Sequence, residues 1–299
     1  GGFVRLKGES GEDVSEGSFV RARFKHKAFI LLAGVGMNIL LAYLILVGLA
    51  FTGLPQVVEN QFSLGRPIYT QEPALLAASV SEGSPAHVAG IKQGDLIEVA
   101  GGQRLSQEKQ LFEYTKEHAG ERVVLEVKSG PETKRVSVVL NDEQTGKTKG
   151  YLGVVPFLTY RQSFGLWAPL VALGILGQLI WGTLSAFGSF LAGLLGGGGS
   201  EAATQVTGPV GIVSLLSHVM ELGLAYLWVF VASISVSLAV INALPLPALD
   251  GGRLAIVTAG RLSRRPLSAQ KEALIHTIGF VLLLALMAVV TYLDIKRIG

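Results

Sequence analysis

The chain has 299 residues, of which 49% are hydrophobic and 16% charged, and its mean hydropathy is +0.49. This composition excludes an ordinary soluble protein of this length and predicts several membrane spans around a more polar insert. The net charge is only +3 and the basic residues lie beside apolar segments, which indicates a lipid bilayer as partner and argues against nucleic acid. With no cysteine, the chain has neither a disulfide framework nor thiolate chemistry.

Residues 28–54 form the first long apolar stretch, directly after the basic run Arg21–Lys27. A bilayer is crossed by roughly 20 apolar residues in a helix, so we expect a transmembrane helix whose basic end is cytoplasmic. His26, in the basic run, is expected to be a solvated interface residue. Asn38 follows two glycines within the span, and it can hydrogen-bond to another helix either as packing or as part of an active site.

Residues 70–156 are more polar and contain short runs with the alternation of half-buried strands. Within them, Gly83–Ile97 reads G-S-P-A-H-V-A-G-I-K-Q-G-D-L-I, which resembles the short helix, turn and strand of PDZ domains. We expect the longer helix of such a domain at Gln107–Glu117. PDZ domains bind peptides by adding a strand to a sheet edge, and backbone N–H groups hold the terminal carboxylate.

A tetrapeptide near the end of this insert resembles the carboxylate-binding loop of circularly permuted PDZ domains. The resemblance implies that it contacts a peptide C-terminus, and the alternative is a strand that only closes the domain. The four residues are Gly150, Tyr151, Leu152 and Gly153.

Residues 163–200 are apolar but rich in glycine, with tryptophans at Trp167 and Trp181 and a run of glycines at the end. Tryptophan favours the membrane–water boundary, so we expect an interfacial helix followed by a flexible loop. A full transmembrane span is the alternative.

Residues 207–299 are expected to form a membrane core with two further spans, at 222–244 and 275–292. The first of these ends in N-A-L-P-L-P-A-L-D-G-G-R, Asn242–Arg253. Its two prolines exclude a continuous helix, and unwound backbone at membrane depth must be satisfied by protein or by a water-filled cavity. An ionisable residue in such a place, Asp250, is a functional candidate, although it could also act as the N-cap of the next helix.

A second basic run, Arg261–Lys271, separates these two spans. Since the insert lies between the first and the later spans, both basic runs are expected on the cytoplasmic side and the insert outside. His276, at the basic end of the last span, is expected to be an interface residue.

The pattern N-x-x-P-x-P-x-L-D-G-G resembles the signature of the site-2 protease family of intramembrane zinc metalloproteases, in its bacterial, PDZ-containing branch. The resemblance implies that Asp250 is a ligand of the catalytic zinc, that Asn242 helps to handle substrate, and that Asn38 belongs to a conserved second-helix element. The segment T-G-P-V-G-I at Thr207–Ile212 resembles a further element of the family. Such enzymes hydrolyse peptide bonds in transmembrane proteins such as anti-sigma factors or remnant signal peptides, and zinc lowers the pKa of a bound water to about 7.

This resemblance also implies a location and a fold. We expect a multi-pass protein of the bacterial inner membrane, with its PDZ domain outside and the L-D-G motif near the cytoplasm. The expected fold class is an α-helical polytopic membrane protein with an inserted α+β PDZ domain.

One element of the family pattern, H-E-x-x-H, is absent from the sequence. The opening G-G-F-V resembles a membrane-associated β-loop that follows the helix bearing H-E-x-x-H, so residues 1–27 are expected to be that loop and its basic flank. The chain is therefore expected to be a fragment that is inactive and holds no stoichiometric zinc by itself. Two alternatives remain, a non-catalytic PDZ membrane adaptor and a transporter built around the broken helix at Asn242–Pro247.

Overall fold

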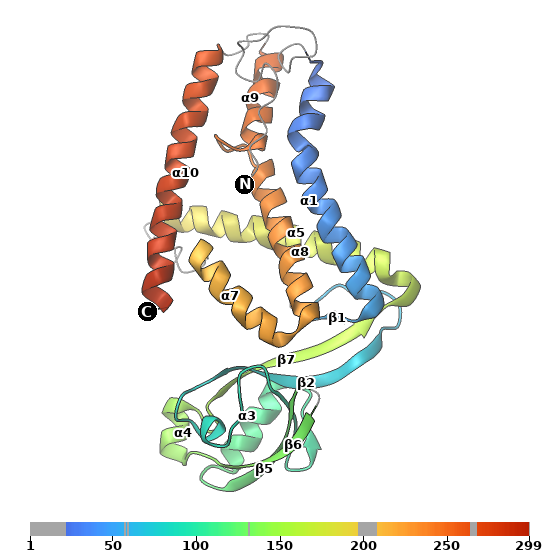
Figure 1. Ribbon diagram of the computed structural model, residues 1–299, viewed down its shortest axis with the longest axis vertical. Helices are drawn as coiled ribbons and strands as arrows, with labels where there is room; N and C mark the ends of the chain where they lie inside the picture. Colours follow the sequence, from blue (N-terminus) through green and yellow to red (C-terminus); the bar gives the residue numbers. More distant parts are fainter. Residues whose placement is uncertain are drawn as a thin grey trace. The chain divides into compact units, whose positions relative to one another are not determined.

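The computed structural model describes residues 22–298 except 57, 59, 131, 197–207 and 264–267. The predicted β-loop at the start and most of the glycine-rich loop therefore lie outside the described residues. The chain divides into two compact units (Figure 1). We call Gly1–Leu46, Leu173–Ser217 and Trp228–Gly299 the membrane unit, and Val47–Ala172 with His218–Leu227 the sheet unit.

Helices form the described part of the membrane unit, and four of them, α1, α5, α7 and α8, continue into the sheet unit. The helices are α1 (Phe24–Thr52), α5 (Ala168–Leu195), α7 (Pro209–Leu222), α8 (Leu224–Ala243), α9 (Asp250–Leu262) and α10 (Ala269–Ile298). Within the described residues, four segments are long and apolar enough to cross a membrane: Phe24–Thr52, Gly165–Gly193, Leu224–Ala243 and Gln270–Lys296. Three of them correspond to the predicted spans.

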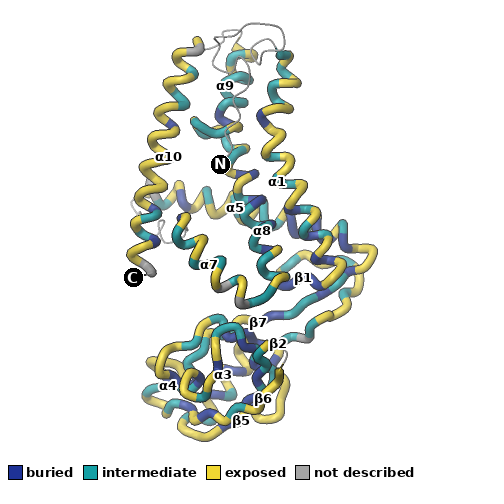
Figure 2. Tube along the Cα trace, viewed as in Figure 1, coloured by how far each residue is buried: buried dark blue, intermediate teal, exposed yellow. Residues whose placement is uncertain are grey.

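Burial distinguishes these helices from one another (Figure 2). In the most apolar window of α8, 33% of the residues are buried, against 11% in that of α10. Large apolar side chains such as Phe280 and Leu282 are exposed on α10. A helix that is apolar all round fits a lipid environment, so α8 is the more central helix and α10 presents most of its surface outward.

The helix ends differ from the sequence prediction of 28–54 and 275–292. α1 begins at Phe24, inside the basic run, and ends at Thr52, because Gly53 has a φ of 138° and the next two residues form a strand. α10 extends beyond the apolar stretch at both ends, from Ala269 to Ile298. Charged residues at the ends of a span are good helix formers, so hydropathy alone underestimates the helix.

α5 bears on whether residues 163–200 span the membrane. It is long enough to do so. In Figure 1, however, the part of α5 in the membrane unit runs across α8 and α10 rather than along them. A helix in that orientation lies along a bilayer that α8 and α10 cross, which favours the predicted interfacial helix.

The sheet unit contains a seven-stranded antiparallel sheet in the order β1-β7-β2-β3-β5-β6, with β4 paired to β3 alone. The strands are β1 (Leu54–Pro55), β2 (Ile68–Val80), β3 (Leu96–Ala100), β4 (Gln103–Arg104), β5 (Arg122–Ser129), β6 (Glu132–Val139) and β7 (Val154–Ser163). Three helices accompany them: α2 (Pro85–Val88), α3 (Glu108–Glu117) and α4 (Glu143–Lys149). The sheet extends beyond the predicted boundaries of 70–156 at both ends.

The core of this unit is a cluster of fully buried aliphatic side chains that includes Leu75, Ile97 and Leu125. They come from β2, β3 and β5, whose registers place them on one face of the sheet. The short helix predicted from the S-P-A pattern is present as α2, capped by Ser84, whose Oγ accepts the N–H of His87 at 3.2 Å. The predicted longer helix is present as α3.

Candidate functional site

The break between α8 and α9 lies where the two prolines predict it. α8 ends at Ala243 and α9 begins at Asp250. Between them the backbone folds on itself, since the N–H of Leu246 donates to Leu244 O at 2.7 Å and the N–H of Leu249 donates to Leu246 O at 3.2 Å. Pro245 and Pro247 have no N–H to satisfy. We call residues 244–250 the LDG hairpin.

The two glycines after Asp250 allow a close approach between the helices. A Cβ on Gly251 would meet the carbonyl oxygens of Ala243 and Leu244, at the end of α8. A Cβ on Gly252 would meet the carbonyl of Leu246. The start of α9 therefore packs directly on the hairpin backbone, which any larger residue would push away.

Asp250 does not cap α9. Leu249 is the N-cap and its side chain makes no capping hydrogen bond, whereas Asp250 is the first helical residue. The N-cap interpretation was therefore wrong by one position. A carboxylate in the first turn is still favoured by the partial positive charge of the helix N-terminus. The residue is exposed, so its carboxylate is accessible in this unit.

Three residues of α10 contact the hairpin and the start of α9. The N–H of Ala248 donates to Nδ1 of His276 at 3.0 Å. Arg253 Nε lies 3.5 Å from Glu272 Oε1, and a Cβ on Gly279 would lie 2.8 Å from the carbonyl carbon of Pro247. We call Glu272, His276 and Gly279 the α10 stripe.

His276, for which the sequence predicted only a position at the interface, is a hydrogen-bond partner of the hairpin. A signal for this role was present in the sequence. The stripe residues are spaced i, i+4 and i+7, which places them on one face of a helix. A glutamate and a histidine on one face near the start of a span need polar partners, and the hairpin provides them.

The two asparagines singled out in the sequence lie on different helices. Asn38 is half-buried in the middle of α1, and Asn242 is half-buried in the last turn of α8. Asn242 thus directly precedes the LDG hairpin, while Asn38 is placed by a separate helix. Their predicted roles stay predictions.

A catalytic zinc site takes three protein ligands, usually His, Cys, Asp or Glu. Among the residues that the structure describes, no three such side chains gather closely enough to hold a metal ion. His276 cannot add to Asp250 here, because its Nδ1 already accepts a hydrogen bond and Nε2 of the neutral ring then carries the hydrogen. The described residues include the predicted ligand Asp250 but do not complete a zinc site.

The T-G-P-V-G-I element contacts the other end of α10. The N–H of Gly211, in the first turn of α7, donates to Asp294 Oδ2 at 2.9 Å. A Cβ on Gly208 would lie 2.7 Å from the same oxygen. Asp294 is only 2% exposed, so its carboxylate is satisfied by a helix N-terminus rather than by solvent.

In the sheet unit, the tetrapeptide Gly150–Gly153 forms a turn before β7. The carbonyl groups of all four residues accept hydrogen bonds, from Asn141 Nδ2 and from the N–H groups of Asn141, Ala86 and Ser81. Within the described part of the chain, the N–H groups of Tyr151, Leu152 and Gly153 donate none. A run of backbone N–H groups of this kind can bind an anion such as a carboxylate.

The strand that follows this turn has an unpaired side. β7 pairs with β2 along its length, but with β1 only at Arg161 and Gln162. From Val154 to Thr159 its other edge is open among the described strands. α3 lies beside it, and the N–H of Leu158 donates to Glu108 Oε1 at 3.1 Å.

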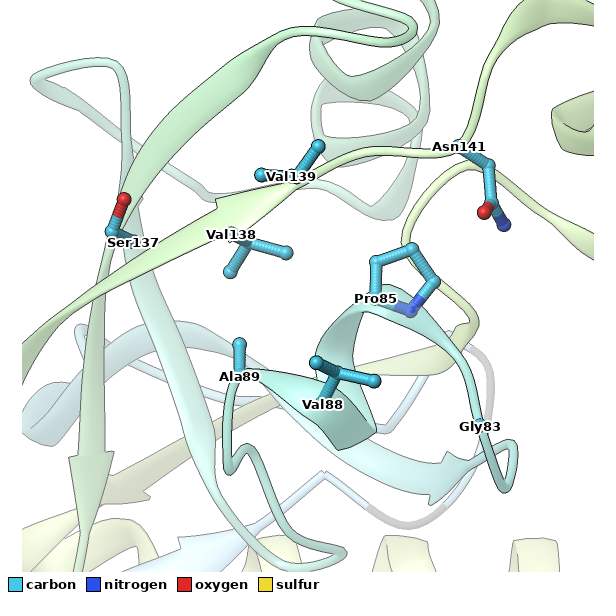
Figure 3. A pocket seen from close by; sticks show the side chains of 8 residues that line it. All are labelled: Gly83, Pro85, Val88, Ala89, Ser137, Val138, Val139 and Asn141. Atoms are coloured by element: carbon cyan, nitrogen blue, oxygen red, sulfur yellow. The ribbon is translucent and has the colours of Figure 1, made fainter.

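A separate shallow groove of about 330 Å³ lies between α2 and β6 (Figure 3). Val88, Ala89, Val138 and Val139 provide its apolar lining, with Ser137 and Asn141 at its polar positions. None of the residues from Gly150 to Gly153 lines it, so the groove and the tetrapeptide turn are different features.

One described residue of each basic run contacts the other. The guanidinium carbon of Arg261, at the end of α9, lies 4.8 Å from the centre of the Phe24 ring, at the start of α1. This contact agrees with the expectation that the two runs meet the same side of the membrane.

The family model for peptidase family M50 matches residues 1–286. The chain is similar to zinc metalloprotease RasP of Shouchella clausii, with 30% identity over 280 residues, 91% of this chain and 60% of that protein. It is 32% identical over 275 residues to the regulator of sigma-W protease RasP of Bacillus subtilis, covering 89% of this chain and 58% of that protein. It is 31% identical over 263 residues to the regulator of sigma-E protease RseP of Salmonella typhimurium, covering 82% and 55%. The chain thus spans little more than half the length of these relatives.

Proposed function

Because the chain belongs to peptidase family M50, we propose that it is the greater part of an intramembrane zinc metalloprotease of the site-2 type. The observation that carries this proposal is the LDG hairpin, a break in an apolar helix that ends with an accessible carboxylate on the first turn of α9. An ionisable residue at such a break needs a functional reason. Metal coordination provides one.

In this proposal Asp250 is one zinc ligand and the remaining ligands come from residues outside the described set. Asn242, in the last helical turn before the hairpin, would contact an unwound substrate segment. The substrates are transmembrane proteins, with anti-sigma factors and remnant signal peptides as the candidate classes. The names of the RasP and RseP relatives, which refer to sigma-factor regulation, support the first class.

The test is an Asp250→Asn variant in a protein extended upstream by the codons of its own gene. We expect the wild type to hold one zinc per chain and to cleave a transmembrane substrate in detergent. The variant should lose more than about a hundredfold in turnover, because even residues around metal ligands are worth about 10- to 100-fold. Asp142→Asn, the same change on the exposed side of the sheet unit, is the control and should cleave normally.

Wild-type turnover by Asp250→Asn would exclude the ligand role. An extended wild-type protein that binds no zinc and cleaves nothing would instead support the membrane adaptor.

We further propose that residues 70–156 of the sheet unit form a PDZ domain that binds free peptide C-termini. The unused N–H groups of Tyr151, Leu152 and Gly153 would hold the carboxylate, and the open edge of β7 would accept the peptide as a strand. In detergent, the chain should bind a peptide with a free C-terminus and lose it when the C-terminus is amidated.

Glu108 offers a matched test of the strand-addition step. Its carboxylate accepts a hydrogen bond from the N–H of Leu158 on the open edge, where an added peptide strand would bind. Glu108→Ala should therefore leave peptide binding intact or strengthen it. Glu113→Ala, on the same helix, removes only an exposed pair with Lys109 and is the control. Equal binding of the free-acid peptide and the amidated peptide would mean that the turn only closes the domain. Binding of neither peptide would fit a domain that excludes bulky substrates by size.

The proposed location is the bacterial inner membrane, with the sheet unit outside and both basic runs in the cytoplasm. Since the chain has no cysteine, single cysteines report accessibility without background. Thr133→Cys should react with an impermeant thiol reagent in cells whose outer permeability barrier is opened, and Ser268→Cys only after lysis. The reverse pattern would invert the topology.

A further inference from the structure

His276 is a half-buried polar residue for which the proposed chemistry has no direct use. It lies on α10, and its ring is anchored by one hydrogen bond, from the N–H of Ala248 to Nδ1. Nε2 is buried and has no hydrogen-bond partner among the described residues. A buried donor without a partner is destabilising, so a histidine kept in this place needs an explanation.

The residue that His276 holds is itself unusual. Ala248 has a φ of +76°, in the left-handed region that a residue with a Cβ rarely adopts. Such a conformation persists only where the surroundings determine it, and it is commonly found at functional sites. Ala248 is two residues before Asp250, so its conformation sets the direction in which the chain enters α9.

The neighbouring contacts of α10 act on the same short segment. Gly279, one turn beyond His276, allows Pro247 to pack against the helix backbone. Glu272, one turn before it, pairs with Arg253 in the first turn of α9, with both side chains mostly buried. The α10 stripe therefore contacts the residue before Ala248, Ala248 itself and the turn that bears Asp250.

From this arrangement we propose that His276 is a positioning residue, which fixes the left-handed conformation of Ala248 and thereby the place of the Asp250 carboxylate. It acts through the hairpin backbone and is not a metal ligand. The part of this inference that concerns the metal and turnover rests on the proposed function, whereas the hydrogen bond to Ala248 does not.

Two substitutions separate the hydrogen bond from simple packing. In asparagine the acceptor oxygen is attached to Cγ, as Nδ1 is in histidine, so His276→Asn keeps an acceptor for Ala248. In glutamine the polar group lies one carbon further out, near the place of Nε2, so His276→Gln keeps a polar side chain but moves the acceptor. His276→Leu removes it.

The first measurement is amide hydrogen exchange at Ala248 in the chain as it stands, in detergent. Exchange is measured in a peptide fragment that covers the hairpin. Because Pro245 and Pro247 have no amide hydrogen, few other amides contribute to the signal of that fragment. We expect wild type and His276→Asn to protect this amide, and His276→Gln and His276→Leu to exchange roughly tenfold faster, as the loss of one hydrogen bond predicts. Equal exchange in all four proteins, or protection in His276→Gln but not in His276→Asn, would overturn the proposal.

The second measurement uses the upstream-extended protein. His276→Gln and His276→Leu should reduce zinc affinity and kcat by about 10- to 100-fold with KM within about twofold, and His276→Asn should restore both. If the wild type neither binds zinc nor cleaves, the proposed function fails while the exchange result still stands. If the exchange pattern holds but kcat and zinc affinity are unchanged, His276 anchors the hairpin without positioning Asp250, and the positioning role is excluded.

Discussion

The sheet unit and the membrane unit use apolar side chains in opposite ways. In the sheet unit Leu75, Ile97 and Leu125 are fully buried, while on α10 the side chains of Val281 and Leu282 are 57% and 64% exposed. The hydrophobic effect in water drives the burial in the sheet unit. A bilayer allows the exposure on α10, because lipid acyl chains are as apolar as leucine.

This difference changes which residues specify the structure. In the sheet unit, apolar burial decides which face of each strand turns inward. Across the membrane unit, apolar residues point in every direction and carry little information, so contacts between polar groups and close backbone approaches define the positions of the helices. The α10 stripe and Asp294 are such contacts.

The strongest test compares two leucine-to-alanine substitutions. Leu125→Ala removes a fully buried side chain from the sheet core and should reduce the free energy of unfolding of that unit by about 2–5 kcal/mol. Leu282→Ala removes a lipid-facing side chain and should change stability by less than about 1 kcal/mol. Hydrogen exchange of β5 and α10 amides in detergent measures each effect in its own unit, and equal losses would contradict the comparison.

A second test asks whether polar contacts do define the membrane unit. Asp294→Leu leaves the N–H of Gly211 without its acceptor and should destabilise the start of α7 by about 1–3 kcal/mol. Asp294→Asn keeps an acceptor oxygen and should destabilise the start of α7 less than Asp294→Leu does. Limited proteolysis near Gly208 would report the release of α7, and unchanged cleavage in both variants would show that the carboxylate is dispensable.

The smallest effect is expected at an exposed charge of the sheet unit. A backbone hydrogen bond from Thr145, at the N-terminus of α4, holds the pKa of Asp142 below its ordinary value of 3.8. Stability from this interaction is thus present above the unfolded pKa and is lost as the pH falls through the folded pKa. Asparagine caps a helix without titrating, so Asp142→Asn should lose slightly less stability than the wild type as the pH falls. Thermal unfolding between pH 5 and about pH 2 measures this difference.

The parts of the fold that could be predicted from the sequence are those with local signals. Apolar length indicated α1, α8 and α10, and the prolines indicated the break before Asp250. The resemblance to PDZ domains located α2, and the structure shows its local signals, Ser84 as the cap and Pro85 at the start of the helix. α4 was missed although its signals were present, Asp142 as the cap and Glu143 four residues before Lys147.

The contacts that define the candidate site could not be predicted in the same way. His276 meets Ala248, and Asp294 meets Gly211, across long stretches of chain whose folding no local pattern encodes. β2 begins at Ile68, before the predicted boundary at residue 70, because its partner β7 is long, and that pairing is equally non-local. Residue spacing on α10 showed which face needed partners but not which partners were present.

Two of the polar side chains of α10, His276 and Asp294, point to the same side of the helix. Asp294 is eighteen residues after His276, which at 3.6 residues per turn is about five whole turns, so both side chains leave the helix on the same side. The rise between them is about 27 Å, close to the roughly 30 Å thickness of a hydrocarbon core. α10 therefore acts as a spacer with a fixed pitch between the LDG hairpin and the start of α7. A single residue inserted between Gly279 and Val290 would rotate one contact by about 100° relative to the other, so the length of this segment is as restricted as the identity of the residues at its ends.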